Sequence, residues 1–276
     1  MKRSRLIVWG TLLAIAAWGF GFEPGWLQQR QLALNSADWQ GPAITIAVAS
    51  DLHVGAPHVS MSMLRRVVAD LNSAKPDLIL LPGDFVHHGL INGESISPEA
   101  IAAELGALKA PLGVYATLGN HDWWFDGERM SKALEAVGIR VLENSALPLD
   151  GLTQKIWLVG IGDDMTGHAN APKALANIPD DARLIVMLHD PANAPELPRQ
   201  SIVALAGHTH GGQVRLPLIG ALITPGRSPL RHSLGWLPDV PVPTYVSAGI
   251  GTSILPVRFN CPPETLVLRL RGKDIS

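Results

Sequence analysis

The chain has 276 residues, of which 47% are hydrophobic, so it contains enough apolar material for one large core or two small ones. Its 22 basic and 24 acidic residues give a formal net charge of −2, and this balance does not predict binding to nucleic acid. Only one cysteine, Cys261, is present, which excludes an intramolecular disulfide and leaves the cellular compartment open.

An apolar run lies at the beginning of the chain. Three basic residues among the first five precede an uncharged stretch from Leu6 to Phe22. As a helix this stretch spans about 26 Å, near the lower limit for crossing a bilayer. We expect residues 1–22 to be a transmembrane anchor; a cleaved export signal, with Gly19 and Gly21 at the cleavage site, and a buried soluble helix are the alternatives. The basic residues predict a single-pass inner-membrane protein whose remainder lies outside the cytoplasm.

Residues 23–42 are polar and mixed, and we expect a linker there with a short helix around Trp26–Leu34. From residue 43 onward apolar runs alternate with helical patterns, which predicts one layered α/β domain over 43–276. Buried strands are expected at 43–49, 78–81, 114–118, 184–188 and 202–206. Helices are expected at 63–71, from the Ser97 cap to 109, and at 128–137.

The second half of the chain has a different pattern. Further apolar segments at 157–160, 245–248 and 266–270 predict strands, with few long helices between them. Residues 217–243 are rich in proline and glycine and are expected to form a long surface excursion. The predicted fold is therefore α/β: two mixed β-sheets packed face to face and flanked by helices, as a four-layer α/β/β/α sandwich.

A short polar cluster follows each of five apolar runs. In open α/β sheets the loops that leave the carboxyl ends of the strands meet at one rim, so these clusters are expected to be neighbours in space. Asp, His and Asn bind borderline-to-hard divalent metals, and the set predicts a two-metal hydrolase. The clusters are Asp51-Leu52-His53, Gly83-Asp84, Gly119-Asn120-His121-Asp122, His189-Asp190 and Gly207-His208-Thr209-His210.

The spacing within the clusters supports this prediction. Asp51 and His53 are two residues apart, as are His208 and His210, and in extended chain such residues point to the same side. A glycine precedes Asp84 and two of the other predicted ligands, where it would allow a tight turn and a close backbone approach.

The ordered set D-x-H, G-D, G-N-H-D, H-D-P and G-H-T-H-G-G-Q resembles the calcineurin-like metallophosphoesterases. The last two clusters, with residues 247–251 and 255–259, resemble a bacterial membrane-associated or exported branch of phosphodiesterases. The resemblance covers residues 44–270. It implies hydrolysis of phosphodiester or pyrophosphate-linked substrates by attack of a metal-bridging hydroxide on phosphorus.

The same resemblance implies roles for individual residues. His121 would be the general acid that protonates the leaving oxygen. Asp122, at a position where other branches have glutamate, would brace His121 or cap the following turn. The two ions could be manganese, iron or zinc, with manganese favoured. The implied ligands are Asp51, His53, Asp84 and His210 for the first ion, and Asp84, Asn120, His189 and His208 for the second.

Several other residues have weaker signals. Trp123-Trp124 directly follow the catalytic cluster and would form an apolar wall beside the phosphate or pack in the core. The pair Asp163-Asp164 follows Gly-Ile-Gly, which favours a turn over a third carboxylate site. Three loop histidines could contact substrate, and three arginines could bind phosphate or remain solvated: His58, His87, His88, Arg215, Arg227 and Arg231.

The expected partners are the membrane and a phosphorylated small-molecule or lipid-linked substrate. One alternative is a hydrolase of the UDP-2,3-diacylglucosamine type, which needs a cytoplasm-facing site that the charge bias argues against. A second is a non-catalytic, metal-dependent scaffold, which the complete set of ligands disfavours. A third is a periplasmic metal carrier, for which a His/Met-rich tract would be typical and is not seen.

Overall fold

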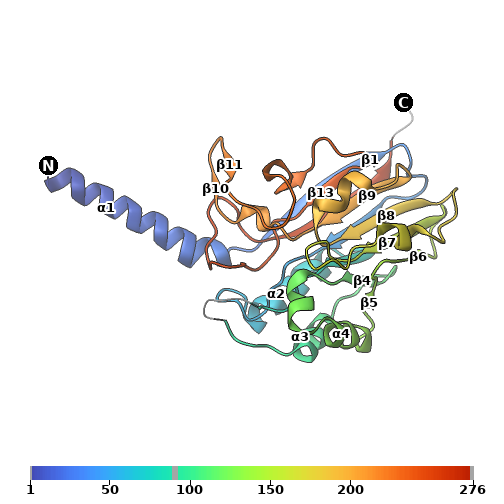
Figure 1. Ribbon diagram of the computed structural model, residues 1–276, viewed down its shortest axis with the longest axis horizontal. Coiled ribbons are helices and arrows are strands. Elements are labelled where there is room, and N and C mark those ends of the chain that lie inside the picture. The colour runs from blue at the N-terminus through green and yellow to red at the C-terminus, as the bar shows by residue number, and fades with distance from the viewer. Residues whose placement is uncertain (1, 89–92, 274–276) are drawn as a thin grey trace.

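The computed structural model describes residues 2–88 and 93–273. Two six-stranded mixed sheets lie face to face, and helices cover their outer sides (Figure 1). This confirms the predicted α/β sandwich. The first sheet has the order β1 (Gln28–Ser36), β14 (Glu264–Gly272), β2 (Ile44–Val48), β3 (Leu78–Pro82), β4 (Val114–Thr117) and β5 (Arg140–Val141). The second has the order β12 (Gly235–Trp236), β13 (Thr244–Val246), β9 (Ser201–Ala206), β8 (Arg183–Leu188), β7 (Ile156–Ile161) and β6 (Ser145–Pro148).

Helices cover the two sheets unequally. The first sheet packs against three helices, α2 (Met61–Ser73), α3 (Pro98–Leu105) and α4 (Asn120–Ala136). The second is covered by the short α5 (Ala171–Leu175) and a 3₁₀ turn at Pro191–Glu196. Smaller elements are the β10 (Arg215–Leu216) and β11 (Gly220–Ala221) hairpin and the 3₁₀ turns His210–Gly212 and Leu230–His232.

The central strands are buried on both faces, which explains why their sequences are continuous apolar runs. In β3, Leu78 and Leu80 point into the core between the sheets, whereas Ile79 and Leu81 point toward the helices. This period-two alternation fixes the register, because a shift by one residue would exchange the two faces. The carboxyl ends of β2, β3 and β4 are thereby placed side by side.

The prediction of a short helix around Trp26–Leu34 is wrong. The segment expected to be a linker contributes a strand. Residues of β1 pair in parallel with β14 at the edge of the first sheet. Leu32 and Leu34 pack against the core between the sheets, while Ala33 between them is exposed. The segment looked like a linker because an edge strand with one solvated face is mostly polar.

The N-terminal helix α1 (Lys2–Ala17) projects away from the two sheets (Figure 1). It continues through a π-helical turn, Trp18–Phe22, and a 3₁₀ turn, Glu23–Gly25. Among the described residues one helical stretch, Ser4–Gly25, is long and apolar enough to cross a membrane, with a mean hydropathy of 1.6 in its best window. Only 11% of that window is buried, so its apolar side chains are not part of the core.

Candidate metal centre

The five polar clusters meet at one rim, where the carboxyl ends of β2, β3 and β4 face those of β8 and β9. Asp51 and His53 follow β2, Asp84 follows β3, and Asn120 begins α4 directly after β4. His189 follows β8. His208 and His210 follow β9, so the predicted convergence of distant loops is present. All the predicted site residues are buried.

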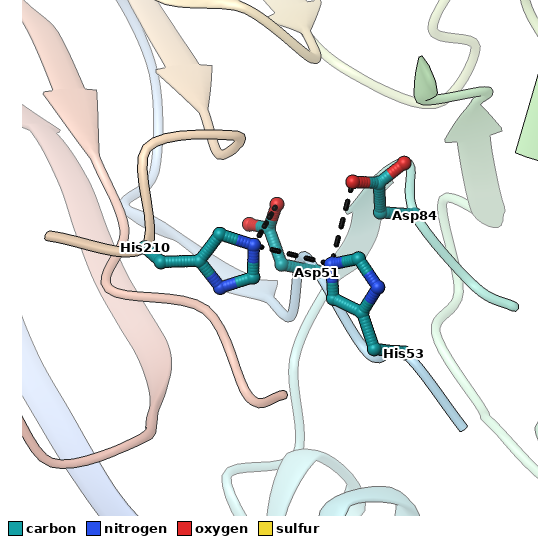
Figure 2. A group of neighbouring side chains, drawn as sticks. All are labelled: Asp51, His53, Asp84 and His210. Atoms are coloured by element: carbon teal, nitrogen blue, oxygen red, sulfur yellow. Dashed lines mark hydrogen bonds and ion pairs between the residues drawn. The ribbon is translucent and has the colours of Figure 1, made fainter. Parts of the chain in front are cut away.

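Four side chains form a first group: Asp51, His53, Asp84 and His210 (Figure 2). The Nε2 atoms of His53 and His210 are 3.1 Å apart. Nε2 of His53 lies 3.4 Å from Oδ2 of Asp84, and Nε2 of His210 lies 3.7 Å from Oδ1 of Asp51. Two carboxylates and two imidazoles thus face one small volume, as a site for a divalent cation requires.

A second group, made of Asp84, His189 and His208, lies beside the first. Nε2 of His189 is 3.4 Å from Oδ2 of Asp84 and 3.1 Å from Nδ1 of His208. The side-chain oxygen of Asn120 is 3.1 Å from Nε2 of His189. Asp84 Oδ2 belongs to both groups, so one carboxylate oxygen lies between the two sets of imidazoles.

The backbone at the site is not extended, contrary to the expectation from the i, i+2 spacing. Asp51 and His53 have φ values of 52° and 44°, in the left-handed region, and Asp84, His208 and His210 also have positive φ. Such conformations cost about 1–3 kcal/mol each in non-glycine residues and persist only where surrounding structure imposes them. Asp51 and His53 still converge, whereas His208 and His210 point into different groups.

Two glycines allow the loops to approach this closely. A Cβ at Gly119 would overlap the carboxylate of Asp84, and a Cβ at Gly207 would overlap that of Asp51. Any other residue at either position would displace a carboxylate of the site. The predicted role of these glycines in close approach is therefore confirmed.

Hydrogen bonds identify which nitrogen of two imidazoles bears a proton. Nδ1 of His189 lies 2.7 Å from the carbonyl oxygen of Pro82, and Nδ1 of His210 lies 3.2 Å from that of Gly251. Because a carbonyl only accepts, both Nδ1 atoms donate, and both rings direct Nε2 toward the carboxylates. Contact with Asp84 outweighs burial and raises the pKa of His189, so without a metal ion its Nε2 also holds a proton, in the place that a cation would take; the neutral ring of His210 presents a lone pair there. Lone pairs and carboxylates in such contact repel unless cations lie between them. The donor set therefore fits divalent metal ions.

The charge state of the site supports this fit. Burial lowers the pKa of His53 and His210, and it lowers that of His208 to about 3, so these rings are in the neutral form that coordinates metals. Burial raises the pKa of Asp51 to about 6. Oδ2 of Asp51 is buried without a hydrogen-bond partner among the described residues. A nearby cation would satisfy this oxygen and favour its ionised form.

Asp122 fixes the loop that positions Asp84. One oxygen of its carboxylate accepts hydrogen bonds from the backbone N–H groups of Asp84 and Gly119, at 2.8 and 2.9 Å. The other accepts from Phe85 at 2.8 Å and Val86 at 3.2 Å. The bond from Gly119 caps α4, as predicted. These four hydrogen bonds all go to backbone groups and none goes to the imidazole of His121, so Asp122 braces the Asp84 loop.

A pocket of about 430 Å³ opens over the two groups. His121 lies on its wall, with its ring centroid 4.5 Å from that of His53 and 5.1 Å from the nearer ring of Trp124. Burial lowers the pKa of His121. Nδ1 of His121 is buried without a hydrogen-bond partner among the described residues. The remaining wall contains Met165, Pro225 and Ile254.

Some of the weaker candidates line the pocket and others do not. Trp124 lines the pocket, whereas Trp123 stacks on His168 at 3.7 Å, away from it. His88 also lines the pocket; His58 and His87 do not. Asp163 accepts two hydrogen bonds from Thr166, as a turn residue does. The three arginines bond to protein groups: Arg215 to Gly211 and Ser233, Arg227 to Asp164, and Arg231 to Asp239.

Two residues of the site were not assigned roles from the sequence. Asp190, within the H-D-P motif, lies 3.6 Å from Nε2 of His208. Arg258 is fully buried, and its guanidinium donates to the carbonyls of Ala248, Gly249 and Gly251, which form the loop beside Asp51 and His210. An acidic residue beside a ligand was a usable signal for Asp190. Nothing local in the sequence distinguishes Arg258 from a solvated arginine.

An Asp/His cluster suited to metal ions, on two mixed sheets flanked by helices, defines the class of metal-dependent phosphoric ester hydrolases. The model of the calcineurin-like phosphoesterase family matches residues 44–212, and the chain belongs to that family. It is 32% identical to the phosphodiesterase YaeI of Escherichia coli over 91% of this chain and 93% of that protein. It is 29% identical to the uncharacterized metallophosphoesterase YkuE of Bacillus subtilis, over 96% and 93%.

A vertebrate relative is similar as well. The chain is 31% identical to a zebrafish protein named as a transmembrane protein with a metallophosphoesterase domain. That similarity covers 80% of this chain and 52% of the zebrafish protein.

Proposed function

We propose that the protein is a membrane-anchored, binuclear phosphodiesterase. The observation that carries the proposal is the position of Asp84, whose Oδ2 lies 3.4 Å from Nε2 of both His53 and His189. One carboxylate oxygen between two sets of imidazoles suits a ligand that bridges two ions. The proposed ligands are Asp51, His53, Asp84 and His210 for one ion and Asp84, Asn120, His189 and His208 for the other, with manganese favoured.

The protein groups around these ions have distinct tasks. When bound, the two ions would supply Lewis-acid polarisation of the phosphoryl oxygens and a lowered pKa of water. His121 binds a non-bridging phosphate oxygen and gives a proton to the leaving oxygen, a contribution of about 10²–10⁴ in rate. Asp122 and the left-handed turns keep Asp84 in place, so that no reorganisation of the loop is needed during the reaction.

The pocket supports a phosphodiester or a pyrophosphate-linked substrate. At about 430 Å³ it has room for a group on each side of the phosphate. Trp124, Met165 and Ile254 give one wall an apolar character, which suits an organic substituent better than a water-exposed dianion. The name phosphodiesterase of the Escherichia coli relative points in the same direction.

The anchor is proposed to remain attached. Cleavage after Gly21 would remove Gly19, whose carbonyl accepts a 2.9 Å hydrogen bond from the backbone N–H of Arg258. It would also remove Trp18, whose indole donates to the buried carboxylate of Glu23. The basic residues before the span favour the cytoplasm, which supports a catalytic domain on the extracytoplasmic side of the inner membrane.

Location can be tested with Asp150→Cys, an exposed position in the turn before β7. Cys261 is buried and gives little background. A membrane-impermeant maleimide should label this variant in intact spheroplasts as well as in lysed cells. Labelling only after lysis would contradict the proposed orientation.

Activity is tested on the full-length chain in detergent, stripped of metal and then titrated with Mn²⁺. We expect hydrolysis of bis(p-nitrophenyl) phosphate in preference to p-nitrophenyl phosphate, and two manganese ions per chain by elemental analysis. His189→Ala should reduce the metal content to one ion, and Asp84→Asn should abolish hydrolysis. The exposed substitution Glu128→Gln serves as the matched control. A fully metallated protein that hydrolyses neither ester would overturn the proposal.

A further inference from the structure

Outside the N-terminal helix and its base, most of the large exposed apolar residues that the structure describes lie in two loops of the second half of the chain. Ile219 and Ile223 of the β10–β11 hairpin segment are 69% and 76% exposed, and Leu218 at its tip is fully exposed. In the loop after β13, Ile254 is 71% exposed. Scattered single residues of this kind need no explanation, but a group of them on two short loops indicates an interaction surface.

Both loops are connected to the base of α1. The side-chain amide of Gln213, at the start of the hairpin segment, donates to the carbonyls of Leu255 and Val257. A Cβ on Gly19 would lie 3.4 Å from Val257, and Arg258 donates to Gly19. In Figure 1, β10 and β11 lie at the end of the two sheets from which α1 projects. The exposed apolar loops therefore lie at the same end of the domain as the proposed membrane anchor.

The base of α1 is fixed to the domain rather than loosely tethered. Glu23 is 2% exposed, and its carboxylate accepts from the indole of Trp18 and from the backbone N–H of Cys261, both at 2.5 Å. Trp18 packs against Phe22 and Trp26, with ring centroids 4.8 and 5.9 Å away. Exposed aromatic rings at the end of an apolar span are typical of the bilayer boundary. These contacts place that boundary at the level of the two loops.

The charge of the loops suits a bilayer surface. Residues 214–225 contain one charged residue, Arg215. In residues 249–259 the one charged residue is Arg258, which is buried. A surface without carboxylates approaches an anionic leaflet with no repulsion. Each aliphatic side chain moved from water into the interface adds to the stability of the contact.

We infer that Leu218, Ile219 and Ile223 of the hairpin, with Ile254, form a second membrane contact beside α1. Ile254 also lines the pocket of the metal centre, so the mouth of the pocket lies at the bilayer surface. The substrate class is then a phosphoester whose apolar chains remain in the bilayer while its phosphate enters the pocket. This inference rests on the proposed anchoring and phosphodiesterase activity.

The depth of the hairpin in the bilayer is measured on the full-length chain in phosphatidylcholine–phosphatidylglycerol vesicles. Leu218→Cys, labelled with an environment-sensitive fluorophore, should be quenched by lipids that carry a quencher near the glycerol. The control is Asp150→Cys. The turn before β7 is hydrogen-bonded to residues 38–40, which follow the end of β1, whereas α1 precedes its beginning. Asp150 is therefore expected to lie far from the bilayer. Its label should remain unquenched.

Activity is compared on two substrates in the same vesicles. In both, water adds to phosphorus and the bond to p-nitrophenolate breaks; one is diacylglycerol p-nitrophenyl phosphate in the bilayer, the other soluble bis(p-nitrophenyl) phosphate. For the triple variant Leu218→Ser, Ile219→Ser, Ile223→Ser we expect about tenfold slower hydrolysis of the lipid. This is the effect expected when aliphatic side chains equivalent to roughly two half-buried groups no longer enter the bilayer. Hydrolysis of the soluble diester should be unchanged.

The possible failures are distinguishable. Loss of all hydrolysis in the unmodified chain would reject the phosphodiesterase, and failure to sediment with vesicles would reject the anchor. The activity and the anchor may both be confirmed while the label on Leu218→Cys stays unquenched and the triple variant hydrolyses the lipid normally. In that case the inference of a second membrane contact is wrong. Protection of the label in detergent together with a dimeric mass would assign the loops to a second copy instead.

Discussion

Nε2 of His208 lies 3.6 Å from Oδ2 of Asp190, on the side of the imidazole away from His189, whose Nε2 is 3.1 Å from Nδ1 of His208. Asp190 is itself held by hydrogen bonds from Ser228 and the backbone of Ala192. Oδ2 of Asp190 and Nε2 of His208 are too far apart for a direct hydrogen bond, but the nearby carboxylate favours a proton on Nε2 of His208 and leaves Nδ1 to face the site. Such partners of metal-binding histidines contribute to metal affinity without touching the ion.

Asp190→Asn should weaken binding of one of the two proposed ions by about 10–100-fold, because the neutral amide no longer stabilises the imidazole proposed to coordinate it. Calorimetric titration of the stripped full-length chain with Mn²⁺ would resolve the two affinities. Asp181→Asn, which alters an exposed ion pair with Lys155, should leave both affinities unchanged. Equal affinities in all three proteins would show that Asp190 does not support His208.

Replacement of Asp122 tests how the Asp84 loop is fixed. Asp122→Asn puts an amide N–H₂ where one oxygen now accepts two backbone N–H groups. We expect the free energy of unfolding to fall by about 2–4 kcal/mol, since buried donors lose their acceptor, and we expect kcat to fall with it as Asp84 shifts. Thermal unfolding in detergent and steady-state kinetics measure the two effects.

The control for Asp122 is on the same helix. Asp126→Asn retains an oxygen that can accept from Arg129 N and is exposed, so its unfolding free energy should change by less than about 1 kcal/mol. If Asp122→Asn melted at the temperature of the unmodified chain, its four hydrogen bonds would have no net role in stability.

His121→Asn tests proton donation separately from binding. With alkyl leaving groups, hydrolysis should slow by about 10²–10⁴-fold, since a poor leaving group needs a proton. With p-nitrophenolate, which leaves without one, the loss should be much smaller. The measurement is the slope of log kcat/KM against leaving-group pKa, at unchanged metal content. A uniform loss across the series would mean that His121 only positions the substrate.

The sequence predicted the parts of the structure that depend on local pattern. Runs such as Leu78–Leu81 are apolar because β3 is buried on both faces, and the ligands follow them because strand ends meet at one rim. The edge strand β1 was missed because its exposed face is polar. The positive φ of Asp51 and the role of Arg258 depend on contacts with residues far along the chain. No local pattern encodes such contacts.

Glu143 shows how burial near the site makes stability depend on pH. One oxygen of its carboxylate accepts a 2.7 Å hydrogen bond from the N–H of Leu118, just before the Asn120 loop, and the other is buried without a partner among the described residues. Burial raises the pKa of Glu143 to about 7. The folded protein therefore retains this proton at pH values at which the unfolded chain has lost it.

The sign of the effect follows from this difference. Protonated Glu143 favours the folded state fully below the unfolded pKa of about 4.3, and the contribution is lost as pH rises to about 7. Glu143→Gln cannot ionise and retains an oxygen for Leu118. From pH 4 to pH 8 its free energy of unfolding, relative to the unmodified chain, should therefore rise by up to about 3 kcal/mol.

Chemical unfolding in detergent at a series of pH values, with the same Mn²⁺ concentration throughout, measures that difference. Other buried groups titrate in both proteins alike, so subtraction isolates Glu143. Glu99→Gln is an exposed control: a hydrogen bond to Arg129 lowers the pKa of Glu99, so its pH dependence has the opposite sign and lies mainly below about pH 4.3. A difference between Glu143→Gln and the unmodified chain that stays constant with pH would mean that burial does not raise the pKa of Glu143.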